Sequence, residues 1–153
     1  MSLDKTNTLL KLLALLNSGP NQECTYELIE LPYRKNIEES LSVIFDAQGN
    51  PYLKQPPERK DFSLRVHPLE DNLESLLFKE FKDWALPYPV DACRENVARE
   101  VARLLCQALG EVIEPSEIFE VFVSPTLWYE AFWKDLAFKG KTQSWLLHLG
   151  VSD

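Results

Sequence analysis

The segment from Asp91 to Gly110 is the clearest helical pattern in the chain and constrains the fold most. Asp91 is a typical N-cap residue, and glycine is the residue type that most often ends a helix. The spacing of three and four predicts a buried face of Cys93, Val97, Val101, Leu104, Leu105 and Ala108. The predicted exposed face holds Arg94, Glu95, Arg99, Glu100, Arg103 and Gln107. Between them, Ala98 and Ala102 would let another element approach closely.

Leucines dominate the segment that ends at Asn17. Thr6 or Asn7 can cap a first helix, which Gly19-Pro20 would stop. Apolar positions occur on more than one side of this helix; they are Leu9, Leu10, Leu12, Leu13, Leu15 and Leu16. We therefore expect a helix that is either sandwiched within the fold or partly covered by a partner. The apolar run is too short to span a bilayer, so no membrane partner is expected.

Alternating apolar residues predict strands at Cys24–Leu31 and at Phe62–His67. The segment Leu41–Leu53 fits a hairpin, because Val-Ile-Phe is followed by a Gly-Asn turn. A helix competes with that interpretation, since Asn36-x-x-Glu39 is a possible capping box. The hairpin is favoured here on strand propensity.

Helical spacing returns after Pro68. It predicts a helix from Leu73 to Trp84 and another over Leu127–Phe138, whereas Ile118–Val123 fits either a strand or part of a short helix. Ser144–Val151 fits a last strand or a short helix. The fold class predicted is α+β, within one globular domain of residues 1–153. A small antiparallel sheet of three or four strands in the N-terminal half would pack against the leucine-rich first helix and a mostly helical C-terminal half.

The charge is acidic and unevenly distributed. The chain has 16 basic and 24 acidic residues, a net charge of −8, and 15 of the acids lie between Leu69 and Asp153. Nucleic acid is itself densely negative, so it is not an expected partner. The three cysteines are odd in number and form no C-x-x-C pair, which indicates a reducing compartment and predicts a cytoplasmic location.

The familiar catalytic and phosphate-binding motifs are missing from the sequence. The chain has only two histidines, His67 and His148, too few for an ordinary zinc site. His67 precedes Glu70, Asp71 and Glu74, which makes a metal-binding cluster conceivable, but we favour acids that stabilise a helix N-terminus. Neither a metal nor another cofactor is therefore expected.

The aromatic segment near the C-terminus is the most informative functional feature. Trp and Tyr dominate protein-interface hot spots, which favours an interaction surface made of Trp128, Tyr129, Glu130 and Trp133. We expect a non-enzymatic protein–protein interaction module, such as an accessory factor, inhibitor or immunity-type protein. The alternative is a small enzyme that uses carboxylates, with His67 or His148 as proton carrier. A homodimer through the first helix and the aromatic segment is also considered.

Overall fold

The computed structural model describes residues 2–47, 63–86, 92–114, 116–124 and 131–152. The described elements are, in chain order, α1 (Leu3–Asn17), β1 (Glu23–Leu31), α2 (Ile37–Ala47), β2 (Ser63–Pro68), α3 (Leu73–Asp83), α4 (Ala92–Val112), β3 (Glu117–Ser124), β4 (Phe132–Lys139) and β5 (Ser144–Ser152). The α+β class is confirmed.

The strands form one five-stranded antiparallel sheet in the order β1-β5-β4-β3-β2. Its first strand along the chain pairs with its last, so the sheet needs both halves of the sequence. The predicted sheet of three or four strands in the N-terminal half is therefore wrong. So is the mostly helical C-terminal half, because β3, β4 and β5 all lie there.

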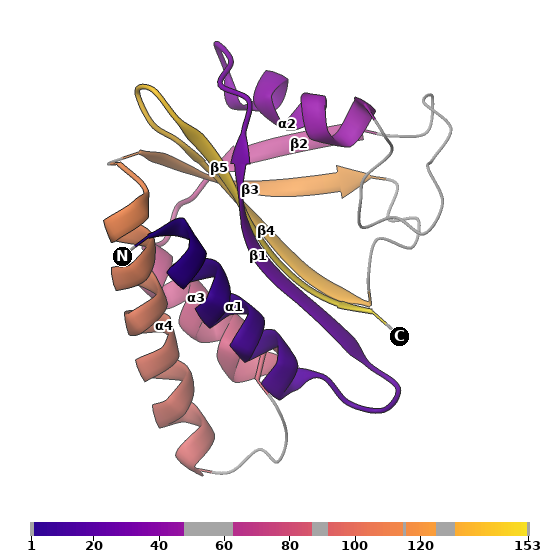
Figure 1. Ribbon diagram of the computed structural model, residues 1–153, viewed down its shortest axis with the longest axis vertical. Coiled ribbons are helices and arrows are strands. Elements are labelled where there is room, and N and C mark those ends of the chain that lie inside the picture. The colour runs from indigo at the N-terminus through magenta and orange to yellow at the C-terminus, as the bar shows by residue number, and fades with distance from the viewer. Residues whose placement is uncertain (1, 48–62, 87–91, 115, 125–130, 153) are drawn as a thin grey trace.

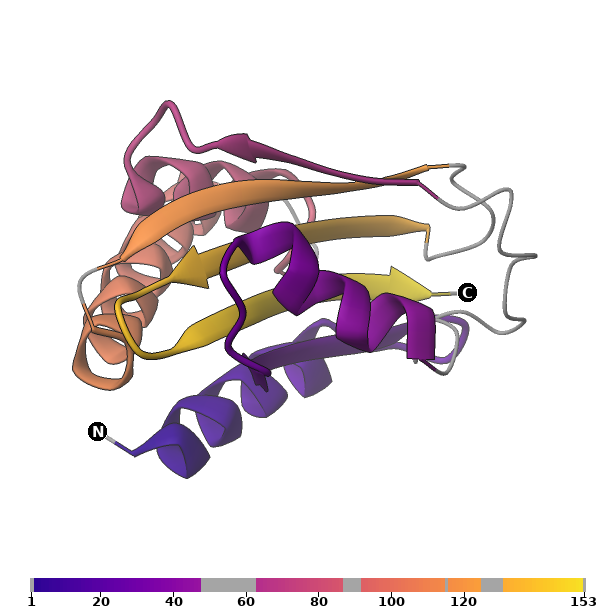
Figure 2. The same cartoon turned by 90° about the horizontal axis from the view of Figure 1, so that it is seen from above.

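Helices cover both faces of this sheet (Figures 1 and 2). On one face, α1, α3 and α4 pack around the larger apolar cluster, which includes Leu10, Leu77 and Leu105. On the other face lies α2, whose Ile37, Leu41 and Phe45 pack against a smaller cluster. We call these the three-helix face and the α2 face.

Two N-terminal strands were predicted near their observed positions, but α2 was not. The Asn36 side chain accepts a hydrogen bond from the Glu39 N–H at 2.8 Å and donates one to the Glu39 carboxylate at 3.0 Å. This reciprocal capping starts a helix where the hairpin was favoured. The hairpin prediction is thus wrong for Leu41–Ala47, and the rest of that segment lies outside the described residues.

The helix predicted over Leu127–Phe138 is also wrong for its described part, since Phe132–Lys139 is β4. Successive side chains of a strand point to opposite faces. Trp133 accordingly packs on the α2 face, whereas Leu136 and Phe138 join the three-helix face.

The outer edge of β1 is bonded by side chains from the α1 region. The Asn7 side-chain amide accepts from the Leu28 N–H at 2.8 Å and donates to the Leu28 carbonyl at 3.0 Å. Ser18, which follows α1, accepts from the Cys24 N–H through its hydroxyl oxygen at 3.1 Å. These three bonds occupy backbone groups that an added strand would need.

Candidate functional site

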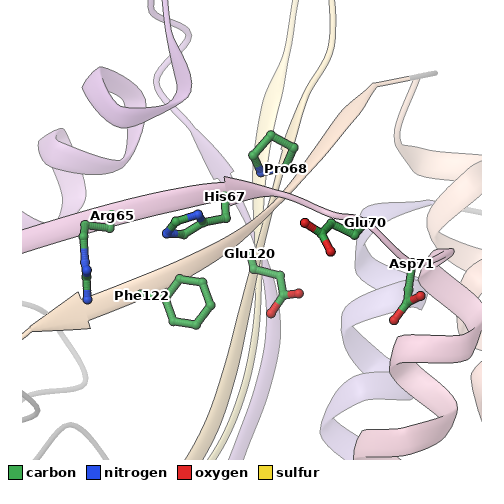
Figure 3. Close-up of a pocket in the computed structure, with 7 residues that line it drawn as sticks. All are labelled: Arg65, His67, Pro68, Glu70, Asp71, Glu120 and Phe122. Carbon is green, nitrogen blue, oxygen red and sulfur yellow. The ribbon is translucent and has the colours of Figure 1, made fainter.

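An open pocket of about 400 Å³ lies over β2, β3 and the connection from β2 to α3 (Figure 3). Leu64 and Val66 of β2 pack on the α2 face, so alternation turns Arg65 and His67 toward the opposite side. The residues that line the pocket are Arg65, His67, Pro68, Glu70, Asp71, Glu120 and Phe122. The antiparallel pairing of β2 with β3 sets Glu120 opposite His67, and the predicted neighbours Glu70 and Asp71 complete the acidic side.

The pocket holds charge of both signs, and its histidine packs against an aromatic ring. The His67 ring meets Phe122 edge-on, with ring centroids 5.4 Å apart. Glu120 forms an ion pair of 2.5 Å with Lys134 on β4. Among the described residues, the His67 ring makes no hydrogen bond, and no group of three or more His, Cys, Asp or Glu is placed to hold a metal ion. The geometry therefore offers a binding hollow rather than an assembled acid–base pair.

The second histidine does have a carboxylate partner, but it is buried. His148 on β5 lies directly opposite Asp135 on β4, and the His148 Nδ1 atom is 2.6 Å from an Asp135 carboxylate oxygen. Both side chains are fully buried. A proton carrier must reach its substrate, so this pair is placed to organise the sheet interior rather than to act on a ligand.

Of the predicted interaction residues, only Trp133 is among the described residues. It is half-buried and packs against the cluster beneath α2. Trp128, Tyr129 and Glu130 lie outside the described residues, so this aromatic surface stays a prediction.

The buried face of α4 is rotated from the predicted one. Its interior side holds small residues: Ala98, Ala102 and Ala108 are fully buried, together with Leu105. Val97 and Leu104, predicted as core, are 50% and 43% exposed, and Cys93 is exposed as well. Arg94, predicted as exposed, is buried and donates to the Leu86 carbonyl. Alanines allow α4 to pack closely on its neighbours, chiefly α3, and Val97 and Leu104 are left on the exposed side of the helix.

The outward side of α1 is apolar too. Leu12, Leu15 and Leu16 are 53%, 63% and 59% exposed, although Leu10 and Leu13 of the same helix are buried. The predicted sandwiching of α1 is therefore wrong for the isolated chain. Its other predicted environment, a covering partner, remains open.

These two apolar rows lie on neighbouring sides of their helices. On α4, Arg99 stacks over Phe78 of α3 at 4.6 Å, so α3 lies along that side. Val97 and Leu104 point the other way around the helix, toward the side where Glu111 interacts with Lys5 of α1. On α1, Leu12 and Leu16 follow Lys5 at helical spacing. In Figure 1, α1 and α4 are closest near the N-terminus and diverge from there.

We call Leu12, Leu15, Leu16, Val97 and Leu104 the α1–α4 surface. Their exposed fractions show that the two helices leave this row of aliphatic side chains largely uncovered. The three leucines of α1 lie within five residues of one another, and grouped exposed apolar residues mark contact sites more often than isolated ones do.

The cysteines show no sign of a nucleophilic site. Cys24 is buried, Cys93 is exposed and Cys106 is half-buried. Burial, with a smaller effect from the nearby Glu74 carboxylate, raises the pKa of the Cys106 thiol to about 11. At neutral pH this thiol is protonated, and a protonated thiol is a poor nucleophile.

Comparisons with known proteins give no family for this chain. No protein-family model matches it, and a search of curated proteins found no similar sequence. Within the part of the chain that the structure describes, no helix has both the length and the apolar character needed to cross a bilayer. The functional argument therefore rests on the geometry of the pocket and of the α1–α4 surface.

Proposed function

We propose that this protein is a non-enzymatic binding protein that recognises another polypeptide through the α1–α4 surface. One observation carries the proposal: three leucines of a single helix are each more than half exposed. Full burial of a leucine side chain contributes about 1.5–3 kcal/mol. A partner that covers this row would recover much of that free energy, which the isolated chain forgoes.

The odd number of cysteines and the lack of a C-x-x-C pair in the sequence support a cytoplasmic location for this binding. The aromatic segment Trp128–Trp133 remains a second predicted contact surface, and the α1–α4 surface does not depend on it.

Photo-crosslinking in the source cells tests the proposal. A photoreactive residue replaces Leu15 in the full chain, and a matched control replaces Glu38, an exposed residue of α2 on the opposite face of the sheet. Discrete adducts that form from position 15 but not from position 38 would support the proposal. Equal adducts from both positions, or none from position 15, would contradict it.

A second candidate function is the binding of a small polar molecule in the pocket between β2 and β3. It is favoured by the grouping of Arg65, His67 and Glu120 around one hollow. Thermal unfolding with a panel of small anions and cations tests it. A stabilising shift that His67→Ala abolishes would support a ligand site there, and unchanged unfolding across the panel would argue against it.

A further inference from the structure

We infer that the polypeptide that covers the α1–α4 surface is a second copy of this chain. This inference rests on the proposed function and names its partner. Two independent properties of the surface favour a second copy over a different protein. They are its charge, compared with the charge of the whole chain, and the area that the two helices offer.

The two helices that form the surface are close to neutral in a strongly acidic chain. Together α1 and α4 hold five basic and four acidic residues, a net charge of +1. The whole chain carries −8, so the remaining residues carry −9. Two identical acidic molecules repel each other through most of their surface. Two copies can approach with least repulsion through a surface whose charge is balanced. A strongly basic partner would instead be attracted to the acidic remainder of the chain.

The charges around the surface are balanced locally as well. Arg99 pairs with Glu95 at 3.2 Å, and Arg103 pairs with Glu100 at 2.6 Å, all within α4. Of these two exposed pairs, Arg103–Glu100 would border the aliphatic side chain of Leu104, whereas Arg99 lies on the α3 side of the helix. An apolar centre with a polar rim is the usual composition of a protein interface.

The area is of the order that a dimer needs. A specific interface buries about 800 Å² on each partner. Helices of 15 and 21 residues are about 22 and 31 Å long, and each is about 10 Å across with its side chains. The outward sides of the two helices, which diverge away from the N-terminus, have a summed projected area of roughly 500 Å², and the accessible area is larger because side chains stand out from the helices. A two-fold axis through this surface would let the same residues contact one another from both copies.

Sedimentation equilibrium of the full chain at micromolar concentrations tests the inference. We expect a particle of twice the 17.7 kDa chain mass. Leu15→Glu should raise the dimer dissociation constant about 100-fold or more, because each copy would bring an unpaired carboxylate into the apolar centre. Leu15 is 63% exposed, so the substitution leaves the monomer core intact. The matched control is Phe122→Glu, an exposed apolar residue of β3; it should leave the dimer unchanged.

Circular dichroism establishes that each variant is folded. The mass of the wild-type particle tests the inference even without a variant. A monomer across the whole concentration range would overturn the inference. A dimer that survives Leu15→Glu, or that Phe122→Glu dissociates, would place the interface elsewhere and overturn it too. The crosslinking experiment separates the two proposals. If the protein is monomeric and the adduct from position 15 does not have twice the chain mass, the partner is a different polypeptide. That result would support the proposed function and reject the second copy.

Discussion

The two faces of the sheet bury their side chains in different ways. The three-helix face is a continuous apolar cluster contributed by three helices and the strands beneath them. The α2 face is smaller, and the buried pair Asp135 and His148 lies on the same side of its strands as Ala137 and Leu146 of that cluster. The first face supplies most of the hydrophobic stabilisation. The α2 face contains a polar interaction, between Asp135 and His148, that can form only when β4 and β5 are paired in the observed register.

That difference teaches how strand alignment is specified. A slip of one residue between β4 and β5 would turn one partner of the pair to the opposite face. The apolar residues of β5 specify this alignment only in part, because the strand is buried on both faces and Leu146 lies on the same face as His148. We therefore expect the buried pair to contribute to the uniqueness of the register as well as to stability.

The largest effect is expected at the polar pair. Asp135→Ala should lower the free energy of unfolding by about 3–5 kcal/mol, because it removes the carboxylate that is 2.6 Å from a fully buried imidazole. Urea denaturation measures the change. Replacement of both residues by leucine should cost less than the single substitution. A loss below about 1 kcal/mol for Asp135→Ala would show that the pair has little structural importance.

The next effect tests the three-helix face with two adjacent leucines of α4. Leu105 is fully buried and Leu104 is 43% exposed. Leu105→Ala should cost about 2–5 kcal/mol, because it leaves a cavity beneath the helix. Leu104→Ala should cost less than about 1 kcal/mol in the monomer. Equal losses in urea denaturation would contradict the observed rotation of α4 and favour the face predicted from the sequence.

A smaller effect, of opposite sign, concerns a polar atom on the three-helix face. The Thr6 hydroxyl oxygen is buried and has no hydrogen-bond partner among the described residues. Thr6→Val keeps the shape of the side chain and should raise the free energy of unfolding by about 1 kcal/mol. Thr8→Val is the control, since the Thr8 hydroxyl donates to the Asp4 carbonyl at 2.7 Å. If the thermal midpoint rises equally in both variants, the gain in stability comes from a change in helix propensity and not from removal of the buried hydroxyl.

The smallest effect lies outside both faces, at the turn between β4 and β5. The Glu114 carboxylate accepts from the N–H and the hydroxyl of Thr142, and the Thr142 N–H does most to hold the pKa of Glu114 below its usual value. A lowered folded-state pKa means that this contribution is present above the ordinary value of 4.5 and is lost as the pH falls below it. Glu114→Gln should therefore make stability decline less steeply in acid, as measured by chemical denaturation at a series of pH values. Glu117→Gln should keep the wild-type slope.

The sequence predicts those strands that have one face more polar than the other. In β1, apolar Cys24, Tyr26 and Leu28 alternate with polar neighbours, and the strand was predicted. In β5, eight of the nine residues are buried. Leu146 interrupts the alternation of Ser144 and His148 with their apolar neighbours, and the short run therefore fitted a strand or a short helix. For α4 the helix was predicted, but its buried face was not. The helix has two apolar faces, and the face that contains Ala98 and Ala102 is the buried one.

The candidate sites were predictable only where their residues are close in sequence. His67, Glu70 and Asp71 are close in sequence and line one pocket, whereas Glu74, which was considered with them, lines another. Glu120 and Phe122 join them through pairing of β2 with β3, which the sequence alone does not specify. The pairing of Asp135 with His148 depends in the same way on the register of two strands.

The hydrogen bonds from Asn7 and Ser18 to β1 have a consequence for aggregation. A nine-residue border strand with apolar side chains is a template on which other chains can polymerise into fibrils. Because the blocking groups come from α1 and the residue that follows it, loss of the N-terminal segment would uncover that template and part of the core together. Proteolytic removal of α1 should therefore yield insoluble, fibril-forming material rather than a merely less stable protein.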